Sequence, residues 1–405
     1  MDGIGIIGIG ISGLQLGLHL QHVGIDTTLY TERPMEQLAA GPLPNTVTRW
    51  GSTLTRERSL DLLDPQADQI GRLRFRVPGT PIDIDGALSE TAETTDFRMY
   101  LPRLLETYLS RGGRLHIGPC GPAQLPDLTQ RHDLVVVAAG QDGFGGTFAI
   151  DATRSPYREP QRHWNVGLYD GITLPEGTDG ELSIVPGVGE VLHARMMSFS
   201  GPVSVISIIA LPQGPLGGLF ATRWAQDRRG FVDGVRTALH TYVPHVHARL
   251  EERSFAPLRE LDVLQGALTP TVRRAWAEVA GRYVLAVGDA WVVNDPIAAQ
   301  GANVGSAAAF ALGAAIAEGG PFDEGFARRT EAAMWAEAEA ATTLSNVLLA
   351  PPSPETIDLL ARASTEPALG DRVVDGLGHP EDMLRLFAGA SAEGELSAPS
   401  APARV

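Results

Sequence analysis

The stretch GIGIIGIGISGLQLGLHL, residues 3–20, decides the fold of this 405-residue chain. Its apolar run over residues 5–9 predicts a buried parallel strand, and residues 12–23 predict a helix that starts among closely spaced glycines. A second strand over residues 27–30 completes one βαβ unit within roughly 30 residues. Such a unit is typical of a dinucleotide-binding cradle, and a glycine-rich turn in some other α/β fold is the alternative.

The three glycines of this turn have different roles. Gly8 allows the tight turn, Gly10 lets the backbone approach a pyrophosphate, and Gly13 lets the helix pack closely on the strand. The free N–H groups and the dipole of the helix N-terminus favour an anion there. Glu32 follows Gly13 by nineteen residues, at the end of the second strand, where an acid accepts hydrogen bonds from an adenosine ribose. These features do not separate NAD from FAD.

A distant stretch, VGDAWVVNDPIAAQGANVG at residues 287–305, separates the two cofactors. Asp289 follows a strand, where its side chain can bind the ribityl chain of a flavin. The loop then bends at Pro296 and ends at a glycine-started helix, whose N–H groups favour the flavin edge that becomes anionic on reduction. NAD has no use for this second site, so the pattern favours FAD over an ordinary strand–loop–helix.

The remaining pattern predicts an α/β fold with a Rossmann-like FAD-binding domain, an inserted and mostly antiparallel β-sheet substrate domain, and a C-terminal helical segment. Short β-rich runs such as VSVISIIAL, separated by Gly and Pro turns, begin near residue 164, and the buried-strand pattern returns with RYVLAVGDA at residues 282–290. The expected divisions are residues 1–43, 96–152 and 275–318 for the FAD-binding domain, 44–95 and 153–274 for the substrate domain, 319–390 for the C-terminal helices, and 391–405 for a disordered tail.

Composition excludes several kinds of function. The net charge of −16 argues against nucleic acid or anionic lipid as a partner. All 32 basic residues are arginine, which excludes any mechanism that uses a lysine amine. Cys120 is the only cysteine, so neither an intrachain disulfide nor a cysteine metal cluster is possible, and His245 and His247 are expected to be solvated loop residues rather than metal ligands. No metal, no membrane span and a cytoplasmic location are expected, since the longest later apolar stretch, residues 307–317, is too short to cross a bilayer.

Together, the glycine motif, DFRMY around Arg98, and the GD, DP and QGAN motifs resemble the FAD-dependent aromatic hydroxylase superfamily. Finer matches resemble its styrene/indole monooxygenase branch, the epoxidase component of two-component systems. These matches cover most of residues 3–320 in the expected order, and they are GLQLGLHL, LYTER, NTVT followed by TRE, DFRMYLPRLLETYLSRGG, HWNVGLYDGI, LDVLQG and DPIAAQGANVGSAAA.

The resemblance implies an enzyme that takes reduced FAD from a separate NADH-dependent flavin reductase. It implies that O2 is trapped as a C4a-hydroperoxyflavin and that one oxygen is delivered to a small aryl alkene or indole. Ala139-Gly140 stands where single-component enzymes carry the Asp-Gly that contributes to NAD(P)H handling, although Asp142-Gly143 leaves this alignment open. A single-component NAD(P)H-dependent aromatic hydroxylase is therefore the alternative, and a homodimer is compatible with either.

The resemblance also implies site residues. Asn45 and Thr46 are expected to line the reactive face of the flavin, with a simple turn as the alternative. Arg98 is expected to reach the FAD phosphate or ribityl region, with a surface salt bridge as the alternative. Residues 42–44, which read Pro-Leu-Pro, and Arg49, where a histidine is expected, depart from the branch pattern and alter the pocket entrance. The residues expected to bind FAD are Gly8, Gly10, Ser12, Gly13, Glu32, Arg33, Arg98, Gly288, Asp289, Pro296, Gln300, Gly301, Ala302 and Asn303.

Overall fold

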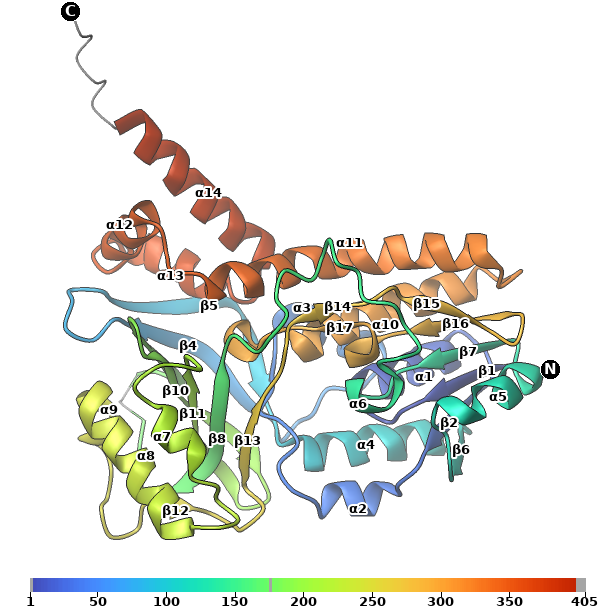
Figure 1. Ribbon diagram of the computed structural model, residues 1–405, viewed down its shortest axis with the longest axis horizontal. Helices are drawn as coiled ribbons and strands as arrows, with labels where there is room; N and C mark the ends of the chain where they lie inside the picture. Colours follow the sequence, from blue (N-terminus) through green and yellow to red (C-terminus); the bar gives the residue numbers. More distant parts are fainter. Residues whose placement is uncertain (1–2, 175–176, 398–405) are drawn as a thin grey trace, which may run out of the picture.

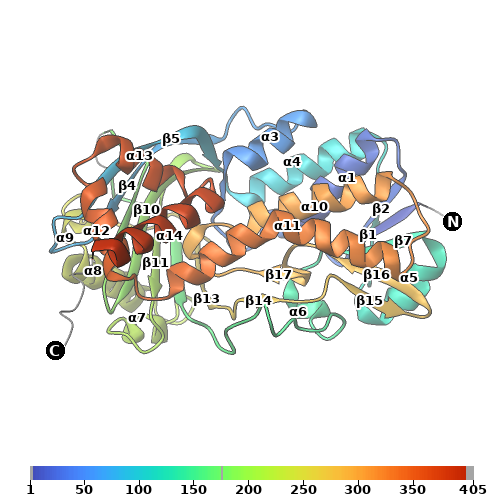
Figure 2. The ribbon, with the colours of Figure 1, turned by 90° about the horizontal axis from the view of Figure 1, so that it is seen from above.

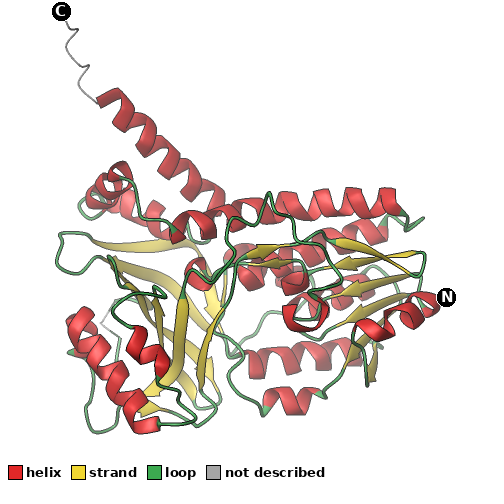
Figure 3. Ribbon diagram, viewed as in Figure 1, coloured by secondary structure: helices red, strands yellow, loops and turns green. Residues whose placement is uncertain are grey.

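The computed structural model describes residues 3–174 and 177–397, and it places two large sheets at the two ends of an elongated molecule (Figure 1). Colouring by secondary structure separates the two groups of strands, with a layer of helices running along one side of both (Figure 3). The segments that build each sheet alternate along the chain, as expected for a domain inserted into another.

The first sheet has six strands in the order β15-β16-β7-β1-β2-β6. All neighbours are parallel except β15 and β16. The central strands are short apolar runs with every residue of β1 and β7 buried, because helices cover both faces. The strands are β1 (Ile4–Ile7), β2 (Thr27–Thr31), β6 (Arg114–Ile117), β7 (Leu134–Val137), β15 (Trp276–Val279) and β16 (Arg282–Ala286).

Helices α1 and α10 lie side by side against this sheet (Figure 2). Glycines make their close approach possible, because a Cβ on Gly313 would stand 2.3 Å from the His19 ring and one on Gly305 would stand 2.4 Å from Ser12 Oγ. The helices and 3-10 turns around the sheet are α1 (Ile11–His22), α2 (Met35–Ala39), α4 (Phe97–Ser110), η1 (Pro122–Gln124), α5 (Leu125–Arg131), α6 (Gln141–Phe144), η2 (Gly288–Ala290), η3 (Pro296–Ala298), α10 (Gly301–Ala317) and α11 (Glu324–Leu349).

The second sheet has nine strands in the order β12-β8-β11-β10-β9-β4-β5-β3, with β13 also paired to β8. Its pairings are antiparallel except for β4 with β9. The strands are β3 (Thr48–Arg49), β4 (Asp68–Arg76), β5 (Asp83–Thr94), β8 (His163–Asp170), β9 (Gly180–Val185), β10 (Gly189–Ser198), β11 (Gly201–Ala210), β12 (Ala256–Pro257) and β13 (Val263–Ala267). A separate two-stranded ribbon joins β14 (Thr271–Val272) to β17 (Val292–Val293).

The two faces of the second sheet have different covers. On one face, Phe231 and Leu239 of α8 pack on the alternate residues Ile206 and Ile208 of β11. On the other, helices from the C-terminal part of the chain pack over β4 and β5. The helices of these two covers, with the linking α3, are α3 (Gly51–Ser59), α7 (Gly217–Ala221), α8 (Arg228–Tyr242), α9 (Pro244–His247), α12 (Pro354–Ala363), α13 (Pro367–Asp375) and α14 (Pro380–Ser397).

The expected α/β fold, with a Rossmann-like part, a mostly antiparallel sheet and C-terminal helices, is confirmed. Two local expectations are wrong. Helix α14 continues to Ser397, so residues 391–397 are helical rather than part of a structureless tail, and residues 398–405 lie outside the described part. His245 lies in α9 and not in a loop, with its Nε2 2.9 Å from Glu181 Oε1.

Two features are absent from residues 3–174 and 177–397. None of the helices in these ranges is long and apolar enough to cross a membrane. Within the same ranges, no group of three or more His, Cys, Asp or Glu side chains is arranged to hold a metal ion.

Candidate functional site

The turn between β1 and α1 has the geometry that its glycines predict. Gly8 has φ +115°, and a Cβ there would lie 2.6 Å from the carbonyl of Ala138 on the neighbouring strand end. A Cβ on Gly13 would lie 2.2 Å from the Gly8 carbonyl oxygen. A Cβ on Gly10 would meet nothing within 4 Å. Gly8 and Gly13 therefore serve close packing, whereas the backbone at Gly10 is open to a ligand.

Helix α1 begins without a side-chain cap. Gly10 occupies the N-cap position, and the first backbone N–H of α1 with an acceptor in the described chain is that of Leu14, which bonds to Gly10. The N–H groups of the first turn of α1, at residues 11–13, are therefore available to an anion. At the end of β2, Glu32 and Arg33 are exposed, at the position expected for the adenosine ribose.

The second motif forms a loop between β16 and α10. Gly288 has φ +64°, and Ser12 Oγ would stand 2.6 Å from a Cβ there, so the strand end and α1 are in contact. Asp289 and Pro296 are exposed, and Asp295 Oδ1 accepts a bond from the Ile297 N–H, which caps the short turn η3.

Helix α10 also begins without a side-chain cap. Its N-cap residue is Gln300, and the first helical N–H with a partner in the described chain is that of Val304. A Cβ on Gly301 would meet nothing within 4 Å, and Ala302 is partly exposed. The backbone N–H groups at the start of α10 are thus a second anion-binding position near the first.

The polar side chains of this motif bind protein. Asn303 Oδ1 accepts from the backbone N–H of Trp50 at 3.0 Å and from Thr53 Oγ1 at 2.8 Å, and its Nδ2 donates to the carbonyls of Thr48 and Ala299, both at 2.9 Å. Gln300 Nε2 donates to the carbonyl of Leu377, between α13 and α14, at 2.6 Å. Asn303 and Gln300 therefore fix the loop, which leaves its backbone for a ligand.

Asn303 also brings the loop of Asn45 and Thr46 to the site, because Thr48 and Trp50 follow that loop directly. Both expected residues are partly exposed and lie outside regular secondary structure. The Asn45 Oδ1 atom is buried and has no partner in the described chain. An acceptor in this state is compatible with a bound ligand or with the turn alternative, so the catalytic role of Asn45 and Thr46 stays a prediction.

Arg98 has protein partners. Asp96, the N-cap of α4, lies 2.6 Å from Arg98 Nη2, and Asp262 lies 2.7 Å from the same atom. Burial lowers the pKa of Arg98, but hydrogen bonds to these two carboxylates outweigh it, and the pKa is raised. The Arg98 guanidinium thus forms a buried ion cluster between α4 and the loop before β13, rather than a surface salt bridge.

The surroundings of Arg49 are not apparent from the sequence. This residue of β3 has no exposed surface and binds the carboxylates of Glu57 and Glu93, the latter at 2.8 Å. The Tyr100 hydroxyl donates to Glu57 at 2.5 Å, and the Arg49 guanidinium lies 4.3 Å from the Tyr100 ring centroid. Burial raises the pKa of both glutamates against the opposing effect of Arg49. The partners of Arg49 come from α3, α4 and β5, so no local sequence signal reveals them.

The backbone groups at the starts of α1 and α10 fit FAD. Two uncapped helix N-termini lie on neighbouring helices, with open backbone at Gly10 and Gly301 for the pyrophosphate and the flavin edge. The flavin, when bound, supplies the activation of O2, and the chain supplies the binding site.

Solved structures with the same fold include p-nitrophenol 4-monooxygenase PnpA from Pseudomonas putida DLL-E4 (TM-score 0.64, 13% identity, 96% of this chain and 98% of that one). They also include the flavin-dependent brominase Bmp2 (TM-score 0.67, 13% identity, 97% and 98%). The chain shares the fold of these flavin-dependent enzymes, and its two uncapped helix N-termini are those expected of an FAD-binding protein.

Sequence relatives narrow the class. A family described as "Styrene monooxygenase A putative substrate binding domain" matches residues 140–249. The chain is 30% identical to Styrene monooxygenase StyA of Pseudomonas fluorescens over 392 residues, 95% of this chain and 94% of that protein. It is also 30% identical to a Styrene monooxygenase StyA from a Pseudomonas species over 407 residues, 98% of each. The chain belongs to the styrene monooxygenase family and is a FAD-dependent monooxygenase that uses O2.

Proposed function

We propose that this protein is the epoxidase component of a two-component system. It receives FAD already reduced by a separate NADH-dependent reductase and uses O2 to epoxidise the C=C bond of an aryl alkene or indole. The observation that carries the proposal is the extent of the match to styrene monooxygenases, which includes the nine-stranded sheet as well as the FAD cradle. The structural neighbours, at 13% identity, share the fold alone.

The proposal assigns a role to each group of residues at the site. The N–H groups at the start of α1 hold the pyrophosphate, and those at the start of α10 hold the flavin edge that gains negative charge on reduction. Asn45 and Thr46 would line the reactive face of the flavin, and Glu32 would bind the adenosine ribose. Arg98, which is bonded to Asp96 and Asp262, would support the FAD site through this ion cluster. The second sheet would aim the alkene and exclude water. Oxygen transfer to an alkene needs no acid or base from the protein, because the cofactor carries this chemistry.

Supply of electrons tests the proposal against the single-component alternative. The purified protein is given chemically reduced FAD, then O2 with styrene or indole, and products are quantified without any reductase present. We expect epoxide from styrene and indigo from indole, and no oxidation of NADH or NADPH by the protein alone. Direct NAD(P)H oxidation with a hydroxylated aromatic product would establish the alternative. Release of all the reducing equivalents as hydrogen peroxide in the presence of both styrene and indole would reject the epoxidase proposal.

A halogenase function is excluded on composition. The brominase shares the fold, but flavin-dependent halogenation in which an enzyme amine carries the halogen needs a lysine, and the chain has no lysine.

A further inference from the structure

A cavity of about 350 Å³ lies where α3, α10, α11 and the start of α14 meet. Figure 2 shows α10 between α3 and α11, with α14 next to α11. The volume lies in the range of small-molecule sites. We call it the Arg56 cavity, and its lining includes Arg56 of α3, Val304 and Ala307 of α10, Glu337 and Ala341 of α11, and Arg385 of α14.

Arg56 brings an unpaired positive charge to this cavity. Its Nε donates to Ser306 Oγ and its Nη2 donates to Thr53 Oγ1, both at 3.1 Å. Both partners are neutral, and within the described residues the Arg56 guanidinium forms no ion pair with a carboxylate. Burial lowers the pKa of Arg56, and the carboxylates of Glu337 and Glu57 oppose this effect only in part.

The Arg56 guanidinium also keeps free hydrogen-bond donors. A guanidinium has five N–H groups, so three remain, two of them on Nη1 and one on Nη2. Donors on both terminal nitrogens match the two oxygens of a carboxylate. Because a partly buried charge is normally paired, this position favours an anionic ligand.

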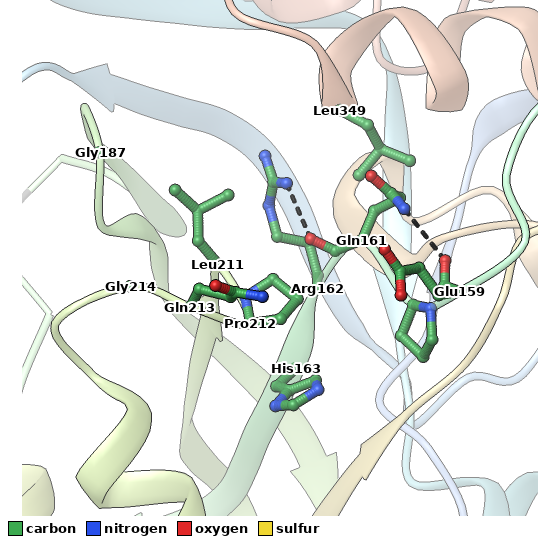
Figure 4. A pocket seen from close by; sticks show the side chains of 11 residues that line it. Glu159, Gln161, Arg162, His163, Gly187, Leu211, Pro212, Gln213, Gly214 and Leu349 are labelled. Atoms are coloured by element: carbon green, nitrogen blue, oxygen red, sulfur yellow. Dashed lines mark hydrogen bonds between the residues drawn. The ribbon is translucent and has the colours of Figure 1, made fainter.

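A second cavity, of about 500 Å³ at the edge of the second sheet, also contains an arginine (Figure 4). There the Arg162 side chain stands between Leu211 and Gln161, but its charge is used within the protein. Arg162 Nε and Nη2 donate to the two carboxylate oxygens of Glu190, both at 3.1 Å, and its Nη1 donates to the Gln161 carbonyl at 3.0 Å. The arginine of the second cavity therefore offers an anion no net charge, whereas Arg56 does.

The other charged side chains of the Arg56 cavity limit the charge that a ligand can carry. Arg385 binds the carboxylates of Glu381 and Asp382 on its own helix, so it adds little positive charge. His379 already faces a carboxylate of α13, and Glu337 adds a further negative charge. Because like charges repel, the cavity favours a ligand with one negative charge over a phosphate or another multiply charged ion.

The floor of the cavity is apolar. Val304 and Ala307 follow one another along one side of α10, and Ala341 of α11 lines the cavity beside them. All three are buried. Covering such a surface favours a ligand with a hydrocarbon part over a bare inorganic ion.

We propose that the Arg56 cavity binds a small organic monocarboxylate, whose carboxylate pairs with the free donors of Arg56 and whose apolar part covers the floor. The cavity is separate from the site described above, because Gly10, Gly301, Asn45 and Thr46 do not line it. The ligand is therefore neither the cofactor nor the molecule that is oxidised. The inference does not depend on the proposed function, since binding requires neither electrons nor O2.

Ligand-observed NMR titration of the full-length protein with bound oxidised FAD measures three probes: benzoate, its neutral isostere benzamide, and inorganic phosphate. We expect benzoate to bind at least about tenfold more tightly than benzamide, because only benzoate pairs with the Arg56 charge. Phosphate at the same concentration as benzoate should leave benzoate bound. Saturating styrene should change the affinity for benzoate by less than about twofold, since the two molecules occupy different sites.

Two variants test the two parts of the cavity. Arg56→Gln removes the charge, and we expect the ratio of benzoate to benzamide affinity to fall to about one. Arg58→Gln, on an exposed position of the same helix, is the matched control and should keep the ratio of the unaltered protein. Ala340→Leu fills the cavity from α11 while Arg56 stays intact, and it should weaken benzoate binding at least about fivefold. Ala336→Leu, exposed on α11 and outside the lining, is its control.

Equal affinities of the unaltered protein for benzoate and benzamide would overturn the inference. So would a preference for benzoate that survives in Arg56→Gln, or equal benzoate affinities of Ala340→Leu and Ala336→Leu. Displacement of benzoate by styrene would place it in the substrate site, and displacement by phosphate would reject an organic monocarboxylate as the ligand. Epoxide assays on the same samples test the proposed function alone, so a protein that forms epoxide without preferring benzoate would reject this inference and keep that function.

Discussion

Substitution of Asn303 tests whether its four side-chain hydrogen bonds stabilise the site. Substitution by alanine removes an acceptor from the Trp50 N–H and donors from the carbonyls of Thr48 and Ala299. The Thr53 hydroxyl, the fourth partner, can rotate to another acceptor. Each backbone group left without its partner costs about 1 kcal/mol, so we expect Asn303→Ala to lower the free energy of unfolding by about 3 kcal/mol.

The same change separates β3 and α3 from the start of α10. We therefore expect weaker FAD binding and, with reduced FAD and O2, more hydrogen peroxide released per epoxide formed. Urea unfolding of the FAD-free protein, fluorescence titration with FAD and peroxide quantification measure the three effects. A free energy of unfolding within about 0.5 kcal/mol of the unaltered value would refute the assignment of these four bonds.

Asn165 provides a matched control. It is a buried asparagine of β8 whose Oδ1 and Nδ2 both lack partners in the described chain. Because its substitution breaks no hydrogen bond, we expect Asn165→Ala to lower the free energy of unfolding by less than about 1 kcal/mol. Equal losses for Asn303→Ala and Asn165→Ala would mean that only burial matters at both positions.

Three further expectations concern the cradle and its surroundings. Gly13→Ala places a Cβ 2.2 Å from the Gly8 carbonyl oxygen, so the free energy of unfolding of the FAD-free protein should fall by at least about 2 kcal/mol. Gly10→Ala meets nothing within 4 Å, so it should leave that free energy unchanged and weaken FAD binding in a titration. Arg98→Met leaves the buried carboxylates of Asp96 and Asp262 without this partner, so chemical denaturation of the FAD-free protein should show a loss of about 3–5 kcal/mol, and a loss confined to FAD affinity would contradict that view. Burial raises the pKa of Asp295 to about 6, so protonation of Asp295 stabilises the fold; this contribution is complete below about pH 4 and is lost as the pH rises through 6. Asp295→Asn keeps the cap on the Ile297 N–H and carries no charge, so between pH 4 and 7 its free energy of unfolding in urea should rise above that of the unaltered protein by up to about 3 kcal/mol.

The cradle was predictable from the sequence because its requirements are local. Gly8 needs a positive φ and Gly13 a contact with Gly8, and both conditions lie within six residues of chain. The second motif was predictable for the same reason, since Asp295, Pro296 and the glycine-started α10 follow one another. A backbone geometry that depends on neighbouring residues is visible as a short residue pattern in the sequence.

The partners of the polar side chains were not predictable in this way. Asn303 binds residues about 250 positions earlier in the chain, and Arg98 binds Asp262, 164 positions later. Any arginine at a helix start is compatible with a phosphate or with a carboxylate, and only the folded chain shows which protein groups surround it.

The wrong prediction for residues 391–397 had a different cause, because the composition of this segment suggested a disordered tail. Yet Ala and Glu favour a helix, and no proline interrupts the chain between Pro380 and Pro399.

In the loop from η3 into α10, the polar side chains bind protein whereas the backbone stays open, so one short segment can both join the two sheets and offer a position for a cofactor. Gln300 reaches the C-terminal helices and Asn303 reaches β3 of the second sheet, so their side chains are committed to protein. The backbone N–H groups at the start of α10 have no side-chain cap in the described part of the chain, and the helix fixes their direction, so they remain available to an anionic group. A shift of the second sheet relative to the first therefore moves the loop of Asn45 and Thr46 together with α10, because Asn303 joins them. Under the proposed function, the loop of Asn45 and Thr46 positions the alkene and the start of α10 positions the flavin edge, so we expect a change at Asn303 to alter the release of peroxide as well as the stability of the fold.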